Sequence, residues 1–256
     1  TKKCGIDVAV ASNGVLWDKT KVEATLPVMT WIRISLNAGT KEDYIKIHNA
    51  REKDWDILFD NLRYAVKLRK EKDYKCTIGV QFLLLRENYK NLDKLAKLLS
   101  ETGIDYLTVK PFIQHLSSGN ILQEDFKNEE IAEIKVKTEK YKTSDFNVIV
   151  RINAMQKLKR EERGYKKCYG LPFFAEIVSN GNIYTCGPFL GNEKFCYGNI
   201  YENSFKEIWE GEQRKKVLDF ALNELDVEDC MQNCRLDEIN KYLWELKNPN
   251  LHVNFI

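Results

Sequence analysis

Four of the seven cysteines lie in two pairs in the C-terminal third of the chain. Seventeen residues separate Cys168 from Cys186, and three separate Cys230 from Cys234. The intervening segments carry hairpin and helix signals, which bring distant thiols to one point. Thiolates bind soft or borderline metals, so the pattern predicts that these four cysteines hold Zn²⁺ or a [4Fe–4S] cluster. Structural zinc usually takes short C-x2-C pairs, so the spacing favours the cluster, with ordinary buried cysteines as the remaining alternative.

The other three cysteines fit this pattern less well. Cys196 lies between the two pairs and is a possible fifth ligand, although a place in the core is the simpler interpretation. Cys76 opens an apolar run and Cys4 lies near the first residue, so both are interpreted as structural.

Composition bounds the class of protein. The 256 residues are 43% hydrophobic, which is enough for a substantial core. The 40 basic and 38 acidic side chains nearly balance, so no nucleic-acid partner is expected. No apolar run approaches the roughly 18 residues of a membrane span, and no signal segment opens the chain. A cytoplasmic protein with reduced cysteines and no membrane association is therefore expected.

Strand and helix signals alternate through the first 155 residues. Short β-branched or apolar runs predict five strands, at 6–12, 31–36, 77–85, 106–109 and 148–152. Periodic amphipathic segments predict helices between them. The strands read as apolar on both faces, which is typical of buried parallel strands joined by helical crossovers. The expected class is α/β, either an open doubly wound sheet or part of a β/α barrel.

The pattern changes near residue 155, where a domain boundary is expected between 1–155 and 156–256. Two short apolar runs flank Asn180-Gly181 and predict a hairpin. Ser204 and Glu207 form a capping-box pattern that opens a helix. The C-terminal part is therefore predicted to be a small hairpin-and-helix domain. Neither GxGxxG after the first strand nor GxxxxGK[ST] occurs, so the two commonest nucleotide-binding motifs are missing.

These motifs together resemble a known family. The C-terminal order is C-x12-G-x4-C from Cys168, then GNI-x3-SF-x2-IW from Gly198, then C-x3-C-R from Cys230. This order resembles the SPASM and twitch region of radical S-adenosylmethionine (SAM) enzymes, which holds auxiliary [4Fe–4S] clusters. Residues 11–14 (ASNG) resemble the family's third-strand TNG motif, and residues 33–36 (RISL) its fourth-strand R-x-S-L motif. The resemblance covers nearly the whole chain and implies a partial (β/α) barrel followed by a SPASM/twitch domain.

The resemblance also implies roles for individual residues. Cys168, Cys186, Cys230 and Cys234 would hold one auxiliary [4Fe–4S] cluster, as in the shorter twitch form, because the fuller SPASM pattern of seven cysteines is not complete here. Asn13 and Ser35, at strand ends, would contact SAM, and Gln81, a lone polar residue in an apolar strand, could do so too. Arg151, placed on the last strand, would contact substrate.

One departure from the family is larger. The C-x3-C-x2-C motif, which holds the SAM-binding cluster, does not occur in this sequence. The expectation is that the first two βα units of the barrel, about 70–100 residues, lie outside this chain, which alone would be inactive.

The function implied is that of a radical SAM oxidoreductase or maturase that abstracts hydrogen from a peptide or from a small polar metabolite such as a sugar or aminocyclitol. Its cofactors would be SAM, the auxiliary cluster and a second [4Fe–4S] cluster, with a reductant such as flavodoxin or ferredoxin as partner. The alternative is a non-catalytic iron–sulfur or zinc-binding module on an α/β scaffold.

Overall fold

The computed structural model describes residues 1–256 except 116–117, 120–125, 160–161, 232–233 and 254–256. The chain divides into two compact units. The first comprises Thr1–Phe112 and Gln123–Met155, and the second comprises Ile113–Leu122 and Gln156–Ile256. The segment 113–122, expected with the N-terminal part, thus groups with the C-terminal part. Among the helices of the described residues, none is long and apolar enough to cross a membrane.

The first unit alternates strands and helices, as predicted. The strands are β1 (Ala9–Ser12), β2 (Trp31–Ser35), β3 (Thr77–Leu84), β4 (Tyr106–Pro111) and β5 (Asn147–Val150). The helices are α1 (Lys19–Thr25), α2 (Lys41–His48), α3 (Asp54–Glu71), α4 (Leu92–Thr102) and α5 (Asn128–Glu139), with α6 (Ile152–Lys157) following β5. The strands form one sheet in the order β1-β2-β3-β4-β5, and every neighbouring pair is parallel. The predicted α/β class is therefore confirmed.

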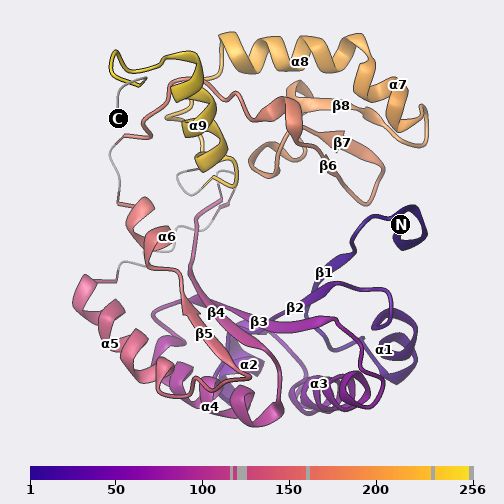
Figure 1. The fold of residues 1–256 in the computed structure, drawn as a ribbon, viewed down its shortest axis with the longest axis vertical. Coiled ribbons are helices and arrows are strands. Elements are labelled where there is room, and N and C mark those ends of the chain that lie inside the picture. The colour runs from indigo at the N-terminus through magenta and orange to yellow at the C-terminus, as the bar shows by residue number, and fades with distance from the viewer. Residues whose placement is uncertain (116–117, 120–125, 160–161, 232–233, 254–256) are drawn as a thin grey trace. The chain divides into compact units, whose positions relative to one another are not determined.

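The two faces of this sheet differ, contrary to the expectation that both are apolar. On β2, the buried Ile32 and Ile34 alternate with the half-buried Trp31, Arg33 and Ser35. The apolar face packs on α3, α4 and α5, which lie along the same side of the sheet (Figure 1). The opposite face carries the polar side chains. Buried and half-buried residues therefore alternate along β2, and polar residues that are far apart in the sequence share one face of the sheet.

Strand β1 differs from its prediction. A buried strand over 6–12 was expected, but β1 spans only Ala9–Ser12, and Ala9, Val10 and Ala11 are all exposed. Its one strand partner in this sheet is β2, so it is an edge strand with little cover on either face. Of its four residues only Val10 is β-branched, and the apolar composition of this strand is not accompanied by burial.

The described part of the second unit contains a three-stranded antiparallel sheet and, besides short 3-10 turns, three α-helices. The sheet has the order β6-β7-β8 and consists of β6 (Glu176–Ile177), β7 (Asn182–Tyr184) and β8 (Cys196–Asn199). The helices are α7 (Phe205–Glu210), α8 (Glu212–Asn223) and α9 (Asp237–Lys247). The predicted hairpin is present, and Gly181 at its turn has φ 85°, a conformation that favours glycine. The predicted capping box of Ser204 and Glu207 opens α7.

Candidate metal centre

The four predicted cysteine ligands occupy connecting segments of the second unit. Cys168 precedes the short helical turn Leu171–Phe173, and Cys186 follows β7 by two residues. Cys230 and Cys234 lie between α8 and α9. All four thiols are free and half-buried. Three of them, Cys168, Cys186 and Cys234, pack against one small apolar core made of Leu171, Ala221 and Leu236.

Polar groups of the protein point at these sulfur atoms. The Asn240 side-chain amide donates to the Cys168 sulfur at 3.3 Å, and the backbone amide of Leu236 donates to the Cys234 sulfur at 3.3 Å. The Thr185 hydroxyl donates to the Cys186 sulfur at 3.7 Å. Asn240 also accepts a 2.7 Å bond from the Gly170 amide, so it ties α9 to the segment of Cys168. Donors of this kind stabilise negative charge on sulfur and orient ligands around a metal.

The four thiols also influence one another. Burial raises the pKa of Cys186 to about 12, and the charges of Cys230, Cys168 and Cys234 add to this increase. Burial likewise raises the pKa of Cys230 to about 11, again with a contribution from Cys234. Burial also raises the pKa values of Cys168 and Cys234. Four thiolates in one half-buried place repel one another, and bound metal cations neutralise this repulsion, so the donor set fits an iron–sulfur cluster.

The arrangement brings the four thiols together without forming a tight site for a single ion. Within the described ranges, no three His, Cys, Asp or Glu side chains are placed so that they could hold one metal ion. The assignment of these cysteines as ligands therefore stays a prediction.

The remaining cysteines lie elsewhere. Cys196 begins β8, and its thiol is 3.7 Å from the carbonyl oxygen of Gly198. Cys76 is buried in the core of the first unit, and burial raises its pKa to about 11. Cys4 is exposed, so the expectation that it is structural is wrong, because an exposed side chain contributes nothing to a core.

The predicted cofactor residues Ser35 and Gln81 lie side by side on the polar face of the first unit. They are direct partners in the register of β2 and β3. The Oε1 atom of Gln81 is buried and has no hydrogen-bond partner among the residues that the structure describes, and the same is true of Nε of Arg33. The Arg33 guanidinium lies 4.9 Å from the centre of the Trp31 ring. Buried polar atoms without partners are unusual, and each needs an explanation such as bound water, an ion or a functional role.

Asn13 and Arg151 have different surroundings. Asn13 is exposed, and its side-chain oxygen accepts a hydrogen bond from the Val15 amide at 3.2 Å. This local bond stabilises the turn that follows β1. Arg151 lies beyond the end of β5, is exposed, and precedes α6, so its predicted place on the last strand is wrong. The strand stops early because Ile152 already belongs to the helix. Their predicted contacts with SAM and substrate stay predictions.

Arg33, Trp31 and Tyr106 were missed as candidate ligand contacts. The Trp31 indole donates to the Tyr106 hydroxyl at 2.5 Å, and the Tyr106 ring lies over Gly79, where a Cβ would come within 2.1 Å of it. The sequence carries a sign of this shared face. In residues 31–35 (WIRIS), isoleucines alternate with Trp31, Arg33 and Ser35, so these three residues point to the same side of a strand.

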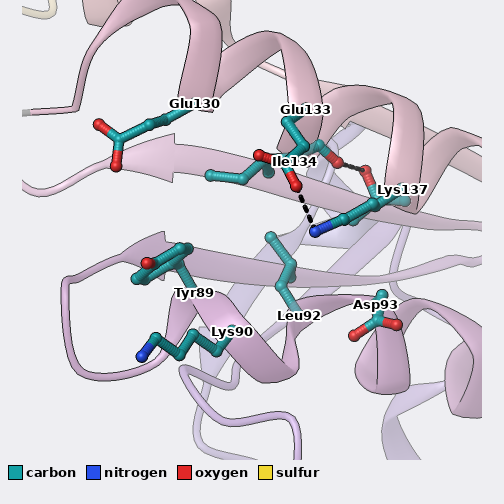
Figure 2. Close-up of a pocket in the computed structure, with 9 residues that line it drawn as sticks. Tyr89, Lys90, Leu92, Asp93, Glu130, Glu133, Ile134 and Lys137 are labelled. Carbon is teal, nitrogen blue, oxygen red and sulfur yellow. Dashed lines mark hydrogen bonds and ion pairs between the residues drawn. The ribbon is translucent and has the colours of Figure 1, made fainter.

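A pocket of about 330 Å³ lies on the outer helical layer of the first unit, between α4 and α5. Figure 2 shows Tyr89, Lys90, Leu92 and Asp93 facing Glu133, Ile134 and Lys137 across it. Glu133 and Lys137 form an ion pair of 2.5 Å within α5. None of the predicted site residues lines this pocket.

The cysteine segment belongs to a recognised domain. Residues 168–235 match the family model of SPASM, an iron–sulfur cluster-binding domain. This range begins at the first predicted ligand and ends one residue after the last. The five-stranded parallel α/β sheet before it belongs to a fold that the chain shares with several solved structures. The chain thus combines a segment that matches a SPASM domain with a parallel α/β sheet that precedes it in the sequence.

Several solved structures share the fold of this chain. Streptococcus suis SuiB superposes with a TM-score of 0.61 at 16% identity, over 85% of this chain and 52% of SuiB. The complex of SuiB with the precursor peptide SuiA superposes with a TM-score of 0.59 at 16% identity, over 85% of this chain and 51% of SuiB. Histidine-tagged anSMEcpe with bound AdoMet superposes with a TM-score of 0.52 at 17% identity, over 92% of this chain and 65% of anSMEcpe. This chain spans about half the length of SuiB. No curated protein matches it in sequence.

Proposed function

We propose that this chain is part of a radical SAM enzyme in which Cys168, Cys186, Cys230 and Cys234 hold one auxiliary [4Fe–4S] cluster. The observation that carries the proposal is the gathering of four half-buried thiols, with donors pointed at their sulfurs, inside the segment that matches an iron–sulfur domain. When bound, this cluster supplies one-electron chemistry, and SAM with its own cluster supplies hydrogen abstraction.

The residues around the thiols have definable tasks. Asn240 holds Cys168 in place through its bonds to both the sulfur and the Gly170 amide. The Leu236 amide does the same for Cys234 at the start of α9. The small apolar core of Leu171, Ala221 and Leu236 limits the access of water to the sulfurs. These groups orient the ligands and lower the local polarity, which together set the properties of a bound cluster.

The polar face of the first unit is the proposed SAM surface. The Arg33 guanidinium is suited to a carboxylate, such as that of the methionyl part of SAM. Ser35 and Gln81 are suited to its hydroxyl and amine groups, and the Trp31 and Tyr106 rings offer apolar surface. The unpartnered Arg33 Nε and Gln81 Oε1 support this proposal, because a ligand would satisfy both.

A peptide is the proposed substrate class. SuiB, which the chain resembles, has been crystallised with its precursor peptide SuiA, and this supports a peptide over a small metabolite. Arg151, exposed and cationic, is kept as a proposed substrate contact. A small electron carrier such as flavodoxin or ferredoxin is the proposed reductant.

Reconstitution of the full chain with iron and sulfide under anaerobic conditions tests the cluster. We expect about four irons and four sulfides per chain, with a visible absorption band that bleaches on reduction. Stoichiometric zinc with no visible absorption would instead identify a non-catalytic zinc module. Analysis of iron, sulfide and zinc in the same sample distinguishes the two.

Titration calorimetry with SAM tests the polar face. Arg33→Leu and Gln81→Leu are each expected to weaken SAM binding about 10- to 150-fold, since one lost hydrogen bond to a charged or buried group costs about 1.5–3 kcal/mol. Lys137→Ala, in the pocket between α4 and α5, is the matched control and should bind SAM as the unaltered chain does. Equal affinity in all variants, or no saturable binding, would count against this surface.

A further inference from the structure

Arg163 is a buried arginine in the second unit that has no assigned role. The residue is 8% exposed. One guanidinium nitrogen, Nη2, donates to the backbone carbonyl of Cys230, and Nη1 lies 3.5 Å from the Tyr165 hydroxyl. The third nitrogen, Nε, is buried and makes no hydrogen bond with any described residue. Arginine is rarely buried without a close carboxylate partner, so this position needs an explanation.

The charge of Arg163 is poorly neutralised by the protein. Its ion-pair partner Glu228 lies 3.9 Å from Nε and is 54% exposed, so solvent weakens the interaction. The buried Asp237 is already paired with Lys157 at 2.7 Å and Lys241 at 3.0 Å. A buried positive charge therefore remains next to the loop that carries Cys230 and Cys234.

We propose that Arg163 is a positioning residue that holds a buried positive charge beside the Cys230–Cys234 loop and thereby raises the reduction potential of the cluster bound there. The proposal rests on the proposed function, since it requires the cluster. One-electron reduction adds one negative charge to a cluster, so a nearby buried cation stabilises the reduced form more than the oxidised form. The bond from Nη2 to the Cys230 carbonyl fixes the distance of this charge from the ligand loop.

Redox titration of the reconstituted full chain, followed by visible absorption and electron paramagnetic resonance, tests this. Arg163→Gln removes the charge and is expected to disfavour the reduced cluster by about tenfold, which is a shift of about 59 mV to a more negative potential for one electron. Arg163→Lys keeps the charge and should retain most of the original potential. Arg235→Gln removes a cation that is 74% exposed beside the same loop and should shift the potential less than Arg163→Gln does.

The outcomes separate charge from structure. A negative shift in Arg163→Gln that Arg163→Lys largely reverses supports the proposal, as does loss of the cluster in the Gln variant but not in the Lys variant when both have the original circular dichroism spectrum. An unchanged potential in Arg163→Gln overturns it. Loss of the cluster in both variants also overturns it, because the guanidinium shape would then matter more than its charge. A chain that binds no cluster before any substitution contradicts the proposed function instead.

Discussion

Replacing Cys186 with alanine is expected to remove the visible absorption of the reconstituted chain. Cys186 lies just after β7, within the influence of the other three thiols, and its sulfur accepts from Thr185. Loss of one ligand leaves the iron with an open position and removes a negative charge from the site. We expect bound iron to fall on the order of tenfold or more, since even changes to the partners of metal ligands typically cost about 10- to 100-fold in metal affinity.

Cys76→Ala is the matched control for this prediction. Cys76 has no predicted ligand role, because it belongs to the core of the first unit. The variant should keep its iron and absorption, although it loses some stability because a small buried side chain is truncated. If Cys76→Ala and Cys186→Ala lose iron equally, the ligand assignment is wrong. Cys196→Ala, measured in the same way, tests the possible fifth ligand.

Replacing Asn88 with alanine is expected to destabilise the first unit by about 2–4 kcal/mol, because three backbone groups lose their partner inside the protein. Asn88 is fully buried. Its side-chain amide donates to the carbonyl oxygens of Asn37 at 3.0 Å and Leu83 at 2.9 Å, and its oxygen accepts from the Leu85 amide at 2.9 Å. It therefore joins the carboxyl end of β3 to the segment that follows β2.

Urea unfolding followed by far-ultraviolet circular dichroism measures this effect. Asn128→Ala, at the exposed start of α5, is the control and should change the free energy of unfolding by less than about 0.5 kcal/mol. A result for Asn88→Ala as small as that of the control would show that other groups or water replace its hydrogen bonds.

Local patterns in the sequence account for most of the correct predictions. The β-branched runs at 31–36 and 77–85 become β2 and β3, because strand propensity and the length of the run act within a few residues. The turn at Asn180-Gly181 and the capping box at Ser204 are set by interactions within three or four residues. The C-terminal cysteine order was specific enough to indicate the SPASM domain.

The errors concern burial and position relative to other elements. The run at 6–12 has the composition of a buried strand, yet β1 is exposed, because exposure depends on what lies beside a strand and not on its own residues. Arg151 was expected on a strand, but the helix that begins at Ile152 ends the strand before it. The segment 113–122 follows the first unit's β4 in sequence but groups with the second unit, where His115 lies 3.5 Å from the Gly187 carbonyl oxygen.

The sequence by itself determined three things: the α/β class of the fold, the alternation of strands and helices, and the four cysteines as candidate metal ligands. Each of these depends on residue types and on short spacings along the chain. Only the tertiary structure decided which side chains share a surface. It placed Arg33 opposite Gly79 in the register that pairs Ser35 with Gln81, and it placed the charge of Arg163 next to Cys230, sixty-seven residues later in the chain. Such contacts depend on how distant segments pack, which no local pattern encodes.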